Sequence, residues 1–300
     1  MSYEEIRLSA AENYSLSVLV FESPEAKASV QIIHGMEEYK ERYLPFAEFL
    51  QINGFNVILP DLRGHGKDAP LLSHIADENG ADLLIRDQRA ITEYIQKRFH
   101  ALPIDLFGHS MGSIIARVLL QTDSASYAKT VLSGYVCPNP LSGIAVTLGK
   151  VVRGLKKPKG HSALLTNLAL GPYSKAVPNH ETALDWLSYN KENVRRYIAD
   201  PLCGVEFTVG SYNALFTLLH RMGSDRPIPN LNARMPILLL AGEDDPCTGG
   251  EKGRAASKAL LEKNGFRAIS ARTYQGMRHE ILNEKDREKV YQDVLEFYRL

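Results

Sequence analysis

Residues 103–120 combine an apolar run, a glycine-rich turn and a second apolar run. The first run, residues 104–107, follows a proline and has the length of a buried strand, whereas residues 111–120 lack proline and are typical of a helix. The turn between them reads GHSMG, a G-x-S-x-G pattern. Glycines at these positions allow a sharp strand-to-helix turn that exposes the serine hydroxyl. We therefore predict Ser110 as a nucleophile; the alternative is a glycine-rich turn with a chance serine.

The composition favours one large domain that acts on a small molecule. The chain has 300 residues, of which 44% are hydrophobic, which suits a single α/β domain with an insertion. Lys and Arg together number 35, as do Asp and Glu. Because the charge is balanced, nothing indicates a nucleic-acid partner. We expect a small-molecule substrate, and the sequence implies no protein partner.

The amino terminus and the cysteines indicate the cellular compartment in which the protein is expected. The chain begins MSYEE, which is acidic where a secretory signal would be basic, and no stretch approaches the ~18 apolar residues of a membrane span. We therefore predict a cytoplasmic protein. Cys137, Cys203 and Cys247 are widely spaced and odd in number, which fits neither a disulfide framework nor a C-x-x-C metal site.

Strands and helices alternate through the first 136 residues. A hairpin is predicted at 6–8 and 14–21, where apolar and polar residues alternate. Further strands are predicted at 30–33, 55–59, 104–107 and 130–133, and helices at 46–53 and 81–99, with Gly54 ending the first helix. This order indicates an α/β fold with a doubly wound, mostly parallel sheet and an antiparallel edge.

The alternation stops near residue 137 and resumes near residue 231. Prolines cluster at both ends of this segment, and helical patches lie at 144–155 and 192–198. We predict an inserted helical cap over 137–230 and a core over 1–136 and 231–300. In the second part of the core, strands are expected at 236–241 and 268–274, and helices at 253–264 and from 285 onward.

The residues that follow each strand carry the chemistry. In a doubly wound sheet, ligands bind beyond the carboxyl ends of the strands. Besides Ser110, these positions hold Met36, an acidic loop at 243–245 and His279. The order serine, carboxylate, histidine is that of a G-x-S-x-G hydrolase, in which histidine takes the serine proton and the carboxylate orients the histidine. The backbone N–H groups of Met36 and Met111 are candidate oxyanion donors.

Other histidines and motifs fit this chemistry less well. His34, His65 and His109 lie in glycine-containing turns, and we interpret them as structural supports. The HEILN stretch at 279–283 lacks the second histidine of a zinc-protease helix, and GHGKD at 64–68 lacks the spacing of a phosphate loop. We predict neither a metal nor another cofactor.

Five motifs together resemble the α/β-hydrolase superfamily, and within it the group of monoglyceride lipases and lysophospholipases. The motifs are HGM at 34–36 with Glu38, Arg42 and Tyr43, DLRGHG at 61–66, GHSMG at 108–112, GEDDP at 242–246 and GMRHE at 276–280. The resemblance covers nearly the whole chain and implies an α/β-hydrolase fold.

The resemblance also assigns roles to residues. It implies Ser110 as nucleophile, Asp245 as acid, His279 as base, and Met36 and Met111 as oxyanion donors. Pro246 supports Asp245 over Asp244, because a following proline restricts the backbone of the residue before it. The family usually has a small residue where Glu37 stands and histidine where Tyr39 stands, which bears on the choice of substrate.

The sequence thus predicts a serine hydrolase that cleaves carboxylic esters of the monoacylglycerol or lysophospholipid type. One alternative keeps the fold but cleaves an amide, as an amidase or aminopeptidase does. Another is a non-catalytic binding protein with a hydrolase fold, whose mark would be a damaged triad.

The predicted cap contains a basic stretch. Lys150, Arg153, Lys156, Lys157 and Lys159 follow the apolar residues 144–148 without an intervening acidic residue. Such a stretch is compatible with weak docking on an anionic membrane surface or with binding of a phosphate head group. It is more often typical of a solvated basic face, which needs no ligand.

Overall fold

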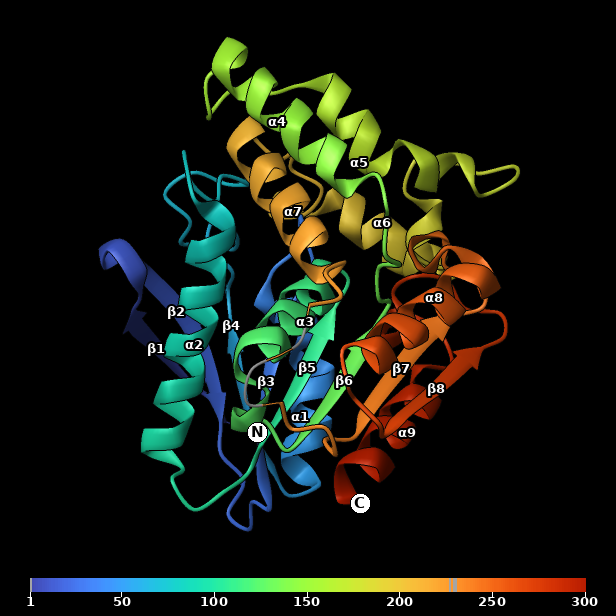
Figure 1. Cartoon of the computed structure of the whole chain (residues 1–300). Helices are drawn as coiled ribbons and strands as arrows, with labels where there is room; N and C mark the ends of the chain where they lie inside the picture. The colour runs from blue at the N-terminus through green and yellow to red at the C-terminus, as the bar shows by residue number, and fades with distance from the viewer. Residues whose placement is uncertain (1, 227, 229–230) are drawn as a thin grey trace.

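A computed structural model describes residues 2–226, 228 and 231–300, and eight of its strands form one sheet. Across the sheet the order is β1-β2-β4-β3-β5-β6-β7-β8 (Figure 1). The strands are β1 (Glu4–Ser9), β2 (Ser15–Phe21), β3 (Ala28–Ile33), β4 (Phe55–Pro60), β5 (Ile104–His109), β6 (Lys129–Ser133), β7 (Ile237–Gly242) and β8 (Ile269–Tyr274). The pairs from β4 through β8 are parallel, which confirms the predicted fold class.

The first two strands form the antiparallel edge. In β1 and β2, Glu4 pairs with Val20 and Ser9 with Ser15, and β2 runs antiparallel to β4. The predicted hairpin is therefore confirmed. β1 is mostly exposed, whereas β3 to β5 are buried on both faces. A strand covered on both sides is normally rich in apolar residues, and these strands are mostly apolar, with Gln31, Asn56 and Asp105 as buried polar exceptions.

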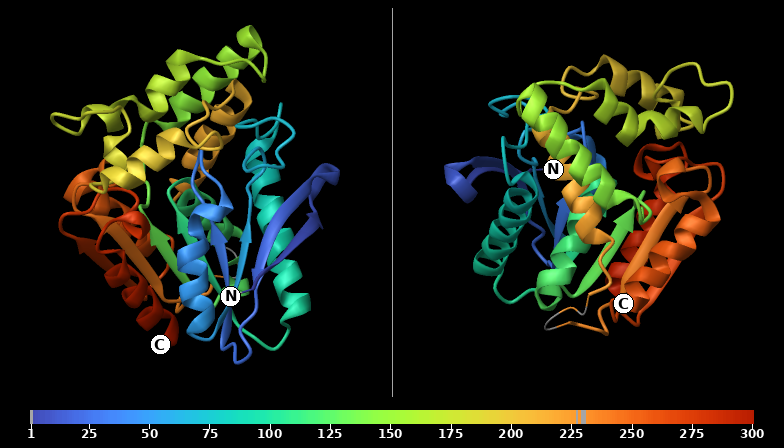
Figure 2. Two further views of the ribbon diagram at one scale, coloured as in Figure 1. Left: turned by 180° about the vertical axis from the view of Figure 1, so that it is seen from behind. Right: turned by 45° about the horizontal axis from the view of Figure 1, so that its top comes forward.

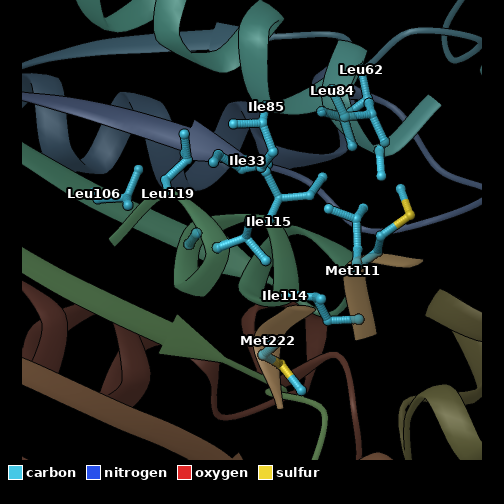
Figure 3. Close-up of a cluster of buried hydrophobic side chains, with 14 of the residues drawn as sticks. Ile33, Leu62, Leu84, Ile85, Leu106, Met111, Ile114, Ile115, Leu119 and Met222 are labelled. Atoms are coloured by element: carbon cyan, nitrogen blue, oxygen red, sulfur yellow. The ribbon is translucent and has the colours of Figure 1, made fainter. Parts of the chain in front are cut away.

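Helices cover both faces of the sheet, and neighbouring strand residues point to opposite layers. In β5, Leu106 belongs to the hydrophobic cluster beneath α2 and α3, with Ile33 and Ile115 (Figure 3). Phe107 belongs to the cluster beneath α1 and α9, with Phe46. The helices of the core are α1 (Leu44–Ile52), α2 (Gly80–Arg98), α3 (Met111–Asp123), α8 (Gly250–Lys263) and α9 (Arg287–Arg299).

Four helices separate β6 from β7 in the chain: α4 (Ser142–Lys156), α5 (Ala163–Lys175), α6 (Lys191–Ala199) and α7 (Val209–Met222). They lie over the end of the sheet at which the parallel strands finish (Figures 1 and 2). The described residues of this segment contain no strand, and the division into a cap over 137–230 and a core over 1–136 and 231–300 stays a prediction. The predicted patches correspond to α4 and α6. Residues 227, 229 and 230, at the predicted end of the cap, lie outside the described residues.

The helices of the cap differ in how they are held. α7 packs against α3, α2 and α4, and its Tyr212 and Leu218 are fully buried in the core cluster. α4 and α5 are the outer helices of the molecule in Figure 1. Within the described residues, no helix combines the length and the apolar character needed to cross a membrane.

Candidate active site

Ser110 lies at the junction between β5 and α3 and adopts a strained backbone conformation. Its φ is 52° and its ψ is −119°, which few residues other than glycine adopt. Such a turn requires small neighbours. A Cβ atom at Gly108 would collide with the carbonyl group of Gly112, and one at Gly112 would collide with the carbonyl oxygen of Ile33. The two glycines of the G-x-S-x-G pattern therefore allow helix α3 to pack against strands β3 and β5.

Two backbone amides lie beside this serine. Met111 is the first residue of α3, and the loop after β3 carries Met36. That loop comes close to Ser110, because a Cβ atom at Gly35 would lie 3.1 Å from the Cβ atom of Ser110. Met36, Met111 and Ser110 line the same cavity. Helix N-termini favour negative charge, so the arrangement suits a developing oxyanion.

Asp245 and His279 meet at the ends of β7 and β8. The Nδ1 atom of His279 lies 3.0 Å and 3.1 Å from the two carboxylate oxygens of Asp245. Both residues are buried, and the backbone N–H of Cys247 donates to Asp245 Oδ1 at 2.9 Å. By contrast, Asp244 is exposed and accepts a hydrogen bond from the Tyr189 hydroxyl at 2.9 Å. Of the two aspartates, only Asp245 is in position to orient His279.

The second nitrogen of the His279 ring, Nε2, takes no part in the contact with Asp245. Its Nε2 atom is buried and has no hydrogen-bond partner among the described residues. The ring packs between His109, at 4.8 Å between centroids, and Trp186, at 5.0 Å. Because Nδ1–H donates to Asp245, Nε2 is the atom left to accept a proton. Ser110 and His279 line the same cavity, so the structure brings together all five residues predicted for the site.

Of the three histidines predicted as structural supports, His34 and His65 connect loops, and His109 contacts the Ser133 hydroxyl at the end of the neighbouring strand. His34 donates from Nδ1 to the carbonyl of Gly35 at 2.8 Å, and its Nε2 accepts from the N–H of Leu62. His65 Nε2 accepts from the N–H of Glu37 at 3.3 Å. Burial lowers the pKa of His34 and of His109 to about 4 and that of His65 to about 3, so all three are neutral at pH 7. Their contacts support the structural role predicted for them.

A family model described as serine aminopeptidase, S33, matches residues 24–286 of this chain. The chain belongs to this family. Its sequence is 29% identical to human monoglyceride lipase over 260 residues, which cover 86% of this chain and 77% of the relative. It is 26% identical to a monoacylglycerol lipase of Mycolicibacterium smegmatis, over 88% of this chain and 85% of the relative. The fold is similar to a carboxyl esterase of Bacillus coagulans, with a TM-score of 0.91 at 23% identity, covering 100% and 98% of the two chains.

The cavity lined by Ser110 and His279 is small and adjoins a larger apolar groove. The cavity has a volume of about 70 Å³, and the groove between α4, α5 and α7 has a volume of about 380 Å³. The two share Val136, Ala169, Tyr173, Leu219 and Cys247 as lining residues. The groove alone has the several hundred Å³ typical of a ligand pocket, whereas the cavity beside Ser110 does not.

An ion-pair network that the sequence did not assign lies behind the loop of Met36. Glu38 accepts from the N–H of Gly35 at 2.6 Å and from the Tyr43 hydroxyl at 2.8 Å. Arg42 bridges Glu38 and Glu280, the residue that follows His279. The network therefore connects the loop of Met36 to the loop of His279. Glu38 and Arg42 belong to the motif at 34–43 that resembles the superfamily, so the sequence marked them as notable. No residue near them in the chain identified Glu280 as their partner.

Asp245, Cys247 and His279 are also the described residues that could hold a metal ion. Their ligand atoms lie within 4.8 Å of one another, and all three residues are buried. The sequence did not predict Cys247 as a possible ligand. It lies two residues after Asp245, and no cysteine or histidine lies at metal-site spacing from it. The absence of a metal cofactor remains a prediction of the sequence alone.

We expect the activity to rise with pH, with a midpoint above the ordinary histidine pKa. Burial lowers the pKa of His279, but Asp245 and the neighbouring Cys247 together raise it well above 6.5. Histidine must be neutral to accept the serine proton, so kcat/KM rises as pH passes upward through this pKa. The measurement is kcat/KM for a soluble ester from pH 5 to 9.

Glu37 is the control for this profile, because burial raises the pKa of this cavity residue to about 7. The acidic limb should persist in Glu37→Gln if it belongs to His279. A rate that does not change between pH 5 and 9 in the unsubstituted protein would exclude histidine as the base.

Proposed function

We propose that the chain is a serine hydrolase that cleaves the ester bond of monoacylglycerols, with lysophospholipids as the second candidate. The observation that carries this proposal is the apolar groove that opens from the cavity of Ser110 and His279. The monoglyceride lipases among the relatives supply the same substrate class. The undamaged set of catalytic residue types argues against a non-catalytic binding protein.

In the proposed mechanism, the Ser110 hydroxyl attacks the ester carbonyl while His279 Nε2 takes its proton. The Asp245 carboxylate accepts a hydrogen bond from Nδ1–H of His279 and stabilises the charged imidazole. The amides of Met36 and Met111 donate to the oxyanion of the tetrahedral intermediate. His279 then gives its proton to the leaving alcohol, which leaves Ser110 acylated. Water, activated by the same histidine, releases the fatty acid and restores the serine.

The groove suits an acyl chain. Its walls include Leu148, Leu168, Phe216 and Leu219, and apolar surface predominates among its lining atoms. Burying a methylene group contributes about 0.8 kcal/mol, so each further carbon that enters the groove strengthens binding. The proposed enzyme should therefore prefer esters whose acyl chain extends past the small catalytic cavity into the groove.

Narrowing the passage between the cavity and the groove should shorten the preferred acyl chain. Ala169 is half-buried in α5 and lines both spaces. In Ala169→Trp, we expect kcat/KM for a long-chain monoacylglycerol to fall at least tenfold, while an acetyl ester is nearly unaffected. The measurement is kcat/KM over a series of acyl lengths. The control is Ala163→Trp, at an exposed position of the same helix. Equal losses over the whole series in Ala169→Trp would contradict the proposed acyl site.

The family description names an aminopeptidase, so the scissile bond needs its own test. An oxyanion site of two amides serves esters and amides alike, and the leaving group makes the difference. Paired p-nitrophenyl ester and p-nitroanilide substrates with the same acyl group compare them directly. We expect the ester to be preferred. A preference for the anilide, above all for one with a free amino group, would favour an aminopeptidase.

The outer face of the cap supports the further proposal that it makes weak contact with anionic membranes. Exposed apolar residues on α4 include Ile144, Val151 and Leu155, of which Leu155 is 80% exposed. Lys150, Lys156 and Lys157 are exposed near them, whereas Arg153 pairs with Glu78. Helices α4 and α5, which line the groove, are the outermost helices in Figure 1. An apolar face flanked by lysines suits an anionic lipid surface. A cytoplasmic location remains a proposal from the sequence.

We expect the protein to sediment with anionic vesicles at low salt and to be released at high salt, because salt screens the lysine charges. Leu155→Glu should weaken this binding, since it places a negative charge on the apolar face. Vesicles of a neutral lipid are the control. If anionic vesicles retain no protein at low salt, the basic stretch is a solvated face.

A further inference from the structure

Glu37 is an unexpected residue beside the oxyanion donor. It follows Met36 directly, lines the active-site cavity and is only 8% exposed. Its φ is +56°, in the left-handed region that favours glycine. The turn is held from three sides: its N–H donates to His65 Nε2, and its carbonyl accepts from the Tyr197 hydroxyl at 2.8 Å and from the N–H of Gly204 at 2.9 Å. The chain thus places a strained, buried carboxyl group where glycine would fit without strain.

The carboxyl group of Glu37 has spare capacity to accept hydrogen bonds. Its Oε1 accepts one, from the N–H of Phe207 at 3.2 Å. In the described part of the chain it forms no salt bridge. A carboxylate has about four acceptor positions, and buried ones are normally paired. Burial raises the pKa of Glu37 to about 7, consistent with the lack of a nearby cation.

The two other glutamates of the cavity differ in this respect. Glu38 is engaged by Gly35, Tyr43 and Arg42, and Glu280 accepts from Arg42 and from Asn193 at 2.6 Å. Their acceptor positions are used to hold loops together. Glu37 is therefore the cavity glutamate that is able to bind a substrate group.

The position of Glu37 indicates which part of a substrate it meets. The apolar groove branches from the cavity through Val136, Ala169 and Leu219, and Glu37 does not line this groove. On the proposed function, the acyl chain occupies the groove and the carbonyl oxygen binds at Met36. The alcohol part of the ester is then left to the polar side of the cavity.

We propose that the Glu37 carboxyl group binds a hydroxyl group on the alcohol part of the ester substrate and so selects esters of polyols. This inference rests on the proposed ester hydrolysis and assigns the head group to it. A hydroxyl donates to a carboxyl group in either protonation state. A phosphate group has no hydroxyl to donate when it is fully ionised, and its negative charge is repelled by the ionised form of Glu37. The enzyme should accordingly favour monoacylglycerols over lysophospholipids.

The test compares two esters with the same short acyl group, glycerol monobutyrate and methyl butyrate. The variants are Glu37→Gln, which keeps the size of the side chain, and Glu37→Gly, which also relieves the strained φ. A hydrogen bond to a charged group contributes enough for a loss of roughly tenfold or more. In both variants we expect kcat/KM for the glycerol ester to fall about tenfold, with a change of less than about twofold for the methyl ester. The matched control is Glu206→Gln, a partly exposed carboxylate next to Phe207 that does not line the cavity.

Each other outcome overturns the proposal in a recognisable way. Equal losses on both esters would mean that Glu37 only holds the loop of Met36. Unchanged rates on both esters would remove Glu37 from substrate selection and leave the proposed ester hydrolysis intact. Butyrylcholine is assayed as a third ester, and a loss confined to it would show recognition of positive charge instead of a hydroxyl group. An unsubstituted protein that cleaves neither ester would overturn the proposed function itself.

Discussion

Ser110→Ala should abolish ester hydrolysis and labelling by a fluorophosphonate probe. Without the hydroxyl no acyl-enzyme forms, and removal of the serine from a well-studied triad costs roughly a million-fold in turnover. The fold should survive, because alanine adds no atoms and the Ser110 side chain is only partly buried. Probe labelling, ester turnover and the midpoint of thermal unfolding measure the three effects.

Ser113→Ala is the matched control for this substitution. Ser113 lies one turn into the same helix, where its hydroxyl donates to the carbonyl of Ser110 at 2.6 Å. Its loss should affect stability more than labelling, since the nucleophile remains. Full activity in Ser110→Ala would exclude the serine-hydrolase mechanism. Labelling that persists with lost turnover would indicate a second reactive nucleophile in the cavity.

Asp245→Asn should lower turnover on the order of ten-thousand-fold, whereas Asp244→Asn should lower it less than about tenfold. Replacing the orienting carboxylate with an amide favours the wrong histidine tautomer, and this is the size of the effect in a well-studied triad. Asp245 lies 3.0 Å from His279 Nδ1, whereas the contact of Asp244 is with Tyr189. The measurement is kcat on one soluble ester at a pH where the unsubstituted enzyme is fully active.

The pH profile of Asp245→Asn provides a second readout. Because the Asp245 carboxylate raises the pKa of His279, its removal should move the acidic limb of the residual activity to lower pH. Asp244→Asn should leave that limb in place. If the effects of the two variants were reversed, the acid would be Asp244, and the assignment of that role to Asp245 would be wrong.

Much of the fold follows from local patterns. Apolar or alternating runs of strand length and the positions of proline and glycine predicted all eight strands. Each of these signals depends only on residues that are close together in the sequence. The same signals missed α5 and α7 as separate helices. α7 is apolar on most sides since it packs against α2, α3 and α4, so its sequence lacks a clear polar face. α5 contains Pro172 and only a weak amphipathic pattern.

The sequence by itself determined the types and order of the candidate catalytic residues and the strand ends that carry them. These follow from chain connectivity and backbone sterics: the glycines around Ser110 and the proline after Asp245 act on their own neighbours. Only the tertiary structure decided which groups meet. The pairing of Arg42 with Glu280, the groove beside Ala169 and the spare acceptor capacity of Glu37 depend on segments far apart in the chain. Burial and hydrogen-bond partners are properties of the packed molecule, so no pattern within one segment contains them.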